Sequence, residues 1–305
     1  MDERVRCLAA VLHWNAPEQA ARCVRSVLAA GVGKGQVVVV DNASTLGSVE
    51  DLITKLAPLG VTVRRNGDNI GYAGGMNVAV GLAQHVGARF ALLLTQDVVL
   101  DPGAIEELLG TAESFERVGV VAPVVYWLQK PTNVFSAGGW VDPRRARVGH
   151  FLTVEGHAPY EVAWVDGCCM LVRVDMIEEI GAFDEGYFMY WEENDLCQRA
   201  RRAGWRVMVA PGAVAWHEGG VDRPRAYWHF MVRNAYTYWK RHFAKGFTPV
   251  MLSLVGWVVR RWALALLPVD LGREGVRVGR GVRIVNAVRA TWGLVTGTLA
   301  YWMGF

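Results

Sequence analysis

The chain has 305 residues, 52% of them hydrophobic and 20% charged, so it can bury the core of one large domain or two smaller ones, and disorder is excluded. Its five cysteines are odd in number and contain no C-x-x-C pair, which argues against a disulfide framework and against a four-cysteine zinc site. The apolar stretch behind the charged N-terminus, residues 7–12, is too short for a signal peptide, and we expect a cytoplasmic protein.

Charge is distributed unevenly along the chain. Residues 1–221 hold 19 Lys and Arg against 26 Asp and Glu, whereas residues 222–305 hold 13 against 3, so the two segments carry net charges of −7 and +10. Arg260 and Arg261 interrupt the apolar, Trp-containing runs of the second segment, and no run reaches the roughly 18 residues of a membrane span. We expect a helical tail that contacts the inner face of the plasma membrane through residues 247–305. The alternative is packing on the rest of the chain or on a second copy in a homodimer.

The first 125 residues alternate short apolar runs with helical patterns. The runs predict strands at residues 4–12, 36–40, 61–65, 89–95 and 118–125. Helices are expected from Pro17 onward and at residues 49–56, 74–85 and 102–114. Apolar strands separated by helices predict a doubly wound α/β fold, with a mostly parallel sheet covered on both faces. Ligands of such sheets bind at the carboxyl ends of the strands.

The alternation ends near residue 126. Short β runs follow at residues 134–141, 147–154, 162–166 and 169–173. A helix is expected at residues 192–203, a strand at 206–210 and a further helix at 223–245, before a basic linker at 271–283. We therefore divide the chain into segments 1–125, 126–221 and 222–305.

Two acidic residues stand directly behind predicted strands. Asp41, followed by Asn42, can accept hydrogen bonds from a nucleobase or a ribose, although an Asx turn that caps the next helix is the alternative. Asp97, preceded by Gln96, lies where a divalent cation bridging phosphates needs oxygen ligands. Asp101, immediately before Pro102, is the better helix cap, which leaves Asp97 for a functional role.

A glycine-rich segment lies at the next strand-to-helix junction, from Asn69 to Asn77, with Gly71, Gly74 and Gly75 inside it. Glycines let a backbone approach a phosphate, and the amides of a helix N-terminus attract it. The alternative is a glycine turn required for tight helix packing. The segment is neither a G-x-G-x-x-G motif nor a Walker loop.

The densest acidic cluster is Glu192-Glu193-Asn194-Asp195, at a predicted helix start with aromatic residues before it. The helix dipole favours one or two acids there, and the third indicates a carboxylate whose surroundings suit a general base. His217 follows a strand and is a candidate imidazole ligand, although a lone histidine is more often structural.

Taken in order, these motifs resemble the family-2 glycosyltransferases of GT-A fold, and within them the bacterial rhamnosyltransferase-like branch, over about residues 5–245. Further matches to that branch are the segments Trp164–Arg173, Gly181–Phe188 and Glu192–Arg199, the pair His217 and Gly220, and Arg233-Asn234. The resemblance implies Glu193 as the general base and a Mg²⁺ or Mn²⁺ ion held by Asp97 and His217. It implies nucleotide-sugar contacts by Asp41, Asn42, Asn69, Gly71, Gly74, Gly75, Asn77, Gln96, Asp166 and Arg233.

The chain departs from the family pattern at two positions. Thr95 stands where the metal element commonly begins with Asp, which puts the identity and affinity of the metal in question. Glu193 stands where the family has an Asp, so the base is one methylene longer.

The resemblance implies an inverting transfer of a sugar to a hydroxyl of a glycan or lipid-linked acceptor. L-rhamnose from dTDP-rhamnose is favoured, and a UDP-hexose is the other donor. Residues 1–125 would then bind the nucleotide sugar and residues 126–221 the acceptor, with no nucleic-acid partner. The alternatives are a sugar nucleotidyltransferase, a dinucleotide oxidoreductase, against which the lack of G-x-G-x-x-G argues, and a non-catalytic binding or membrane scaffold protein.

Overall fold

The computed structural model describes residues 5–154, 156–219, 227–243, 252, 255–260, 262–263 and 280–302. By its contacts the chain divides into two compact units. The first comprises Met1–Trp140, Gly149–Phe188 and Glu192–Gly219, and the second Val141–Val148, Met189–Trp191 and Gly220–Phe305. The two ends of the helix predicted at 223–245, and residues 271–279 of the predicted linker, lie outside the described residues. Among the helices described, none is both long and apolar enough to cross a bilayer.

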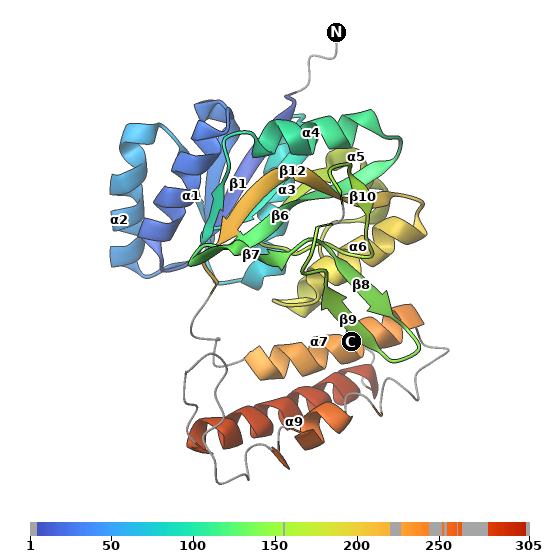
Figure 1. Cartoon of the computed structure of the whole chain (residues 1–305). Coiled ribbons are helices and arrows are strands. Elements are labelled where there is room, and N and C mark those ends of the chain that lie inside the picture. The colour runs from blue at the N-terminus through green and yellow to red at the C-terminus, as the bar shows by residue number, and fades with distance from the viewer. Residues whose placement is uncertain are drawn as a thin grey trace. The chain divides into compact units, whose positions relative to one another are not determined.

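One mixed sheet forms the centre of the first unit (Figure 1). Its strands run in the order β10-β12-β6-β11-β4-β1-β2-β3, with β5 paired to β12 and β7 to β6. Their bounds are β1 Cys7–His13, β2 Val37–Asp41, β3 Thr62–Arg65, β4 Phe90–Thr95, β5 Val98–Leu100, β6 Val118–Trp127, β7 Lys130–Ser136, β10 Tyr160–Glu161, β11 Cys169–Arg173 and β12 Arg206–His217. A separate two-stranded sheet joins β8 Gly139–Asp142 and β9 Arg147–His150.

Parallel pairing dominates the part of the sheet predicted from the alternating pattern. Strand β1 runs parallel to β2 and β4, β2 to β3, and β6 to β12, whereas β11 is antiparallel between β4 and β6. The carboxyl ends of β1, β2 and β4 therefore meet at one edge, where His13 lies beside Asp41 in register. The predicted α/β fold is confirmed.

Helices cover both faces of this sheet (Figure 1). On one side lie α1 Pro17–Ala29, α2 Leu46–Leu56 and α4 Ala104–Ser114, and on the other α3 Gly71–His85, α5 Val174–Ile180 and α6 Glu192–Arg202. Short 3-10 turns are η1 Lys34–Gln36, η2 Ala57–Leu59 and η3 Glu185–Tyr187. The helix predicted from Pro17 onward is α1, which buries Ala20, Val24 and Val27 against the alternate residues Ala9 and Val11 of β1.

Two predictions for the middle of the chain are wrong. Residues 162–166 form no strand, because only Trp164 bridges to Gly139. The run at 134–141 is interrupted before β8, where Gly138 adopts a left-handed φ of 82°. Strand β5, only three residues long, had too weak a pattern to be predicted.

In the second unit, α7 Tyr227–Phe243 packs against α9 Arg280–Trp302. Their apolar cluster contains Trp228 and Val232 of α7, Ala290 of α9, and Val258 from the segment between them. The helical tail is thus present in the residues that the structure describes.

Candidate functional site

Asp97 and His217 form an ion pair at the carboxyl edge of the sheet. The chain turns after β4, and β5 pairs antiparallel with β12 in a register that sets Val98 opposite His217. Asp97 Oδ2 lies 2.9 Å from His217 Nε2, and the Thr95 hydroxyl donates to Asp97 Oδ1 at 2.6 Å. A short strand thus joins two polar residues that are distant in the sequence.

Each member of the pair stabilises the charged form of the other. Burial by itself would raise the pKa of Asp97, but hydrogen bonding and the charge of His217, with help from Thr95, lower it. Burial likewise opposes protonation of His217, but the hydrogen bond and charge of Asp97 outweigh it and raise the pKa of the imidazole. The side chains are only 22% and 15% exposed, so water screens this pair weakly.

A divalent cation suits the chemistry of this pair. Carboxylate and hydroxyl oxygens are ligands that Mg²⁺ accepts, and an imidazole is a common ligand of transition metals such as Mn²⁺. His217 Nδ1 is buried and has no hydrogen-bond partner among the described residues. No three His, Cys, Asp or Glu side chains of the described chain converge as a metal cage, so a bound ion needs further ligands from phosphates or water.

Asp166 and Glu193 both lie close to the turn at Gly167. The Tyr72 hydroxyl donates to the Gly167 carbonyl at 2.6 Å, and Asp166 Oδ1 accepts from the Cys168 amide at 2.9 Å. A Cβ on Gly167 would lie 2.8 Å from the Tyr72 hydroxyl and 3.7 Å from Glu193 Cβ, so glycine permits this close approach. Burial, followed by the charges of Glu192, Glu193 and Asp166, raises the pKa of Tyr72.

The acids of α6 differ in their surroundings. Asp195 is fully buried, accepts from Arg199 Nε at 2.7 Å and lies 3.3 Å from the Tyr187 hydroxyl. The Arg199 guanidinium also donates to the carbonyls of residues 180, 181 and 182. Asp195 therefore anchors the loop before α6, whereas Glu193, which is partly exposed, faces the Gly167 turn.

Asp41 is completely buried, with a fully buried histidine beside it. His13 Nδ1 lies 2.8 Å from Asp41 Oδ1, and the Ala16 amide donates to His13 Nε2 at 3.2 Å. These contacts require the neutral Nδ1–H tautomer, and burial lowers the pKa of His13 despite the opposing effect of Asp41. Asp41 Oδ2 lies 3.7 Å from Arg65 Nε, and Arg65 is 38% exposed, so Asp41 contacts a side chain that reaches solvent.

Asn42 joins the strand-end loops to the glycine segment. Its amide nitrogen donates to Asn69 Oδ1 at 2.9 Å and to the Gly71 carbonyl at 3.0 Å, and its oxygen accepts from the Ile70 amide. The amides of Gly71 and Ala73, at the start of α3, donate to Asn69 Oδ1 and to the Phe188 carbonyl. Both amide donors are therefore bound by the protein itself.

The glycines of this segment are packed against neighbouring side chains. A Cβ would meet the Phe188 carbonyl at 2.3 Å on Gly71, Ile70 at 2.9 Å on Gly74, and Leu12 at 2.4 Å on Gly75. The alternative that we gave above, tight helix packing, therefore describes them in this structure. Nucleotide contact by Asn69, Gly71, Gly74 and Gly75 stays a prediction.

Three further predicted contact residues bind other protein groups. Asn77 exchanges hydrogen bonds with the backbone of Phe183 and donates to Glu185, so its amide holds that loop. Gln96 accepts from the Trp14 amide at 2.8 Å and donates to its carbonyl at 3.2 Å. Arg233 lies on α7 in the second unit and donates to Asn234 Oδ1.

Residues 6–237 match the sequence profile described as glycosyltransferase like family 2. The chain belongs to this family.

Its relatives within the family include rhamnosyltransferases. An N-acetylglucosaminyl-diphospho-decaprenol L-rhamnosyltransferase from Mycobacterium tuberculosis is 28% identical over 206 residues, which cover 59% of this chain and 66% of that protein, just under two thirds of its length. The rhamnosyltransferase WbbL from Escherichia coli is 43% identical over 61 residues, 20% of this chain and 23% of that protein.

A solved structure with lower sequence identity has a similar fold. The mannosyltransferase PcManGT from Pyrobaculum calidifontis, solved with GDP-Man and Mn²⁺, superposes with a TM-score of 0.56 at 14% identity, covering 95% of this chain and 88% of that one. The likeness confirms the GT-A-like fold of this family-2 chain.

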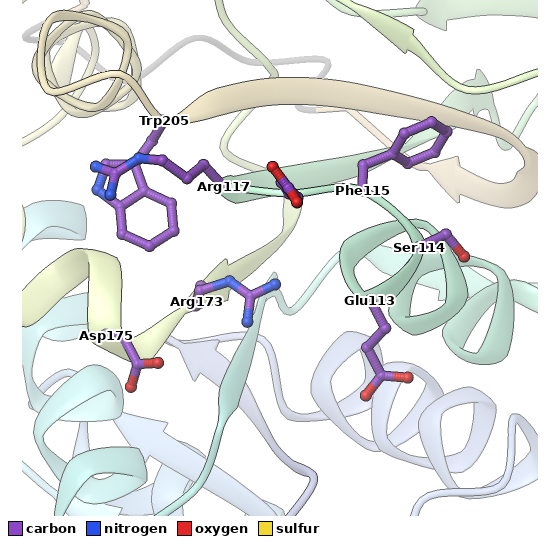
Figure 2. Close-up of a pocket in the computed structure, with 8 residues that line it drawn as sticks. Glu113, Ser114, Phe115, Arg117, Arg173, Asp175 and Trp205 are labelled. Atoms are coloured by element: carbon purple, nitrogen blue, oxygen red, sulfur yellow. The ribbon is translucent and has the colours of Figure 1, made fainter.

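A hollow of about 340 Å³ lies at the amino-terminal ends of β6 and β12, away from the carboxyl ends that carry Asp97 and His217 (Figure 2). Its cationic side chains bind protein atoms: Arg117 pairs with Glu179 at 3.2 Å and lies over the Trp205 ring, and Arg173 donates to the Val118 carbonyl at 2.8 Å. We therefore assign this hollow to packing, and not to the site of a family-2 enzyme.

Our sequence analysis missed two residues of the site. His13 ends β1 and contacts Asp41, and the strand-end rule that selected Asp41 would also have selected His13. Tyr72, inside the glycine segment, bonds the Gly167 turn, and only its place beside the glycines could have indicated it.

Proposed function

We propose that this family-2 chain is an inverting, metal-dependent glycosyltransferase, which moves a sugar from a nucleoside diphosphate to an acceptor hydroxyl. The observation that carries the proposal is the half-buried Asp97–His217 pair at the carboxyl edge, with Asp166 and Glu193 beside the neighbouring turn. Parallel α/β sheets bind their ligands at this edge.

Asp97 and His217 are the residues that would hold the ion. A bound Mg²⁺ or Mn²⁺ neutralises the charge that develops on a leaving diphosphate. Without an ion, His217 and Asp97 each favour the charged form of the other. To hold an ion, His217 would have to release its proton, because only the neutral imidazole is a metal ligand. Thr95 holds the second carboxylate oxygen in place.

Glu193 accepts the proton of the acceptor hydroxyl in this proposal. It is the partly exposed acid of its helix, whereas Asp195 is used in the bond to Arg199. Asp166 contacts the donor sugar or the acceptor. Asp41, held by His13, acts on the nucleotide through Arg65 in this proposal. The donor pocket is lined by Asn42, Asn69, Gln96 and the glycines of the segment 69–77.

The names of the relatives support a choice of donor and acceptor. We propose L-rhamnose from dTDP-rhamnose as the transferred group, with UDP-hexoses as the second choice, because the mycobacterial and Escherichia coli relatives are named rhamnosyltransferases. The mycobacterial name includes a diphospho-decaprenol sugar, so we propose a lipid-linked acceptor presented at the cytoplasmic leaflet.

A donor panel tests the proposal. The purified protein is incubated with N-acetylglucosaminyl-diphospho-decaprenol as acceptor, with dTDP-rhamnose, UDP-glucose or UDP-galactose as donor and with Mn²⁺ or Mg²⁺, and released nucleoside diphosphate is measured. We expect release from dTDP-rhamnose, loss of release in EDTA, and a loss of about 10²-fold or more in Asp97→Asn. Binding of every donor without release by the wild type would show a binding protein, and full activity of Asp97→Asn would refute the metal assignment.

A further inference from the structure

Helix α9 of the second unit turns apolar side chains outward. We call the exposed residues of this helix the α9 outer face: Val282, Val285, Val288, Trp292 and Val295. Every residue of α9 that is at least 36% exposed in the described side chains is therefore Val or Trp. An ordinary surface helix carries polar residues at these positions.

The side of α9 that faces away from the α9 outer face consists mainly of small residues, although Arg283 is also buried on this helix. Ala287 and Ala290 are buried, and a Cβ on Gly293 would lie 2.4 Å from the His229 carbonyl oxygen of α7. At about 100° per residue, this side lies roughly opposite the α9 outer face. Leu294 packs against the cluster with α7, but the Val and Trp side chains of the α9 outer face do not belong to that cluster.

The segment before α9 has the same character. Leu252, Val255, Trp257 and Val259 are between 42% and 70% exposed, whereas Val258 is buried in the cluster with α7. Trp257 and Trp292 together place two exposed indoles in this unit. Indole rings are enriched at the boundary between lipid headgroups and acyl chains.

The charges of this unit indicate what the α9 outer face binds. Residues 222–305 carry 13 Lys and Arg against 3 Asp and Glu, and the described parts of α7, α9 and residues 255–263 contain no acidic residue. Arg241 and Arg260 are exposed, and Arg289 is half-buried on α9. Two such surfaces from two copies would repel each other, whereas anionic lipid headgroups attract them.

We propose that the α9 outer face, with the exposed apolar residues at 252–259, docks on the surface of a bilayer that contains anionic lipid. The helix lies in the interface, because no described helix is long and apolar enough to cross. The proposal depends on neither metal nor donor, so a protein without transferase activity would still show this binding.

Co-sedimentation of the full chain with vesicles tests it. Phosphatidylcholine vesicles with and without about 30% phosphatidylglycerol are compared in about 0.05 M and about 0.5 M NaCl, since salt screens the attraction. Val288→Asp places a charge on the α9 outer face at a position that is 50% exposed. Ile53→Asp, at a 51% exposed position in the first unit, is the matched control. A second variant, Trp292→Ser, reduces the apolar area of the α9 outer face without adding a charge. Circular dichroism verifies that each variant is folded.

We expect wild type and Ile53→Asp to bind the anionic vesicles at low salt and to bind less at high salt. Val288→Asp and Trp292→Ser should bind at least about tenfold more weakly, because apolar area is lost from the interface. Wild type that stays in the supernatant overturns the proposal, as does Val288→Asp or Trp292→Ser binding as well as wild type. If wild type does not bind vesicles but forms a dimer that Val288→Asp dissociates, the α9 outer face contacts a second copy of the chain instead.

Discussion

Gly71→Ala is the sharpest test of the packing found at the start of α3. Gly71 has a φ of 74°, which costs a residue with a Cβ about 1–2 kcal/mol. The added Cβ would also lie 2.3 Å from the Phe188 carbonyl oxygen and 2.7 Å from two ring carbons of Phe188. Relieving such contacts costs a further 1–3 kcal/mol or so, and we expect a total loss of about 2–5 kcal/mol in the free energy of unfolding.

The same helix supplies the control. Gly81 also lies in α3, but a Cβ there meets nothing within 4 Å, and its φ is not left-handed. Gly81→Ala should therefore stabilise the protein by about 0.5–1 kcal/mol, since glycine in a helix interior is unfavourable relative to alanine. The two substitutions are chemically identical and differ only in their surroundings.

Urea unfolding, followed by tryptophan fluorescence and by far-UV circular dichroism, measures both variants. The predicted order of midpoints is Gly81→Ala above wild type and Gly71→Ala clearly below it. A Gly71→Ala midpoint equal to that of wild type, combined with weaker donor binding, would refute the packing role and favour a glycine kept only for the approach of a phosphate.

Two further predictions concern the carboxylates. Glu193→Gln should lose about 10²-fold or more in turnover with little change in donor affinity, and if Glu192→Gln is the inactive variant instead, the base is misassigned. Burial lowers the pKa of His13 in the folded protein. Below about pH 6.5 the unfolded chain therefore takes up a proton that the folded protein does not. The free energy of unfolding consequently decreases as the pH falls further. The free energy of unfolding of His13→Gln, measured in urea, should fall less steeply than that of wild type between about pH 6.5 and 5.5, by up to about 1.4 kcal/mol per pH unit, and equal slopes would contradict the neutral histidine.

The periodic parts of the sequence predicted the fold because each decides its own structure locally. The continuous apolar runs that became β1, β2 and β4 could only be strands of a covered sheet, and the strand-end rule selected Asp41 and Asp97. The tail was recognisable in the same way, from its charge and its tryptophans.

The pairing of Asp97 with His217 could not be predicted from local pattern. It depends on β5, three residues long, finding its antiparallel register on β12 across more than a hundred residues of chain. The burial of Asp41 depends in turn on the neighbour that β1 supplies, His13.

The direction of individual side chains could not be predicted from the sequence either. Asn77 shares a motif with Asn69, yet its amide is bound to the loop at Phe183. Asp195 shares a cluster with Glu193, yet it is bound to Arg199. Motif membership indicated the region, and only tertiary packing separated the residues that face the Gly167 turn from those that hold loops in place.

The position of a bound Mn²⁺ ion tests the central claim most directly. Crystals grown with Mn²⁺ and a nucleoside diphosphate would show the ion in anomalous difference density. We expect a peak about 2 Å from a carboxylate oxygen of Asp97, with the diphosphate also bound to the ion. A bound nucleotide whose Mn²⁺ lies away from both Asp97 and His217 would contradict the account.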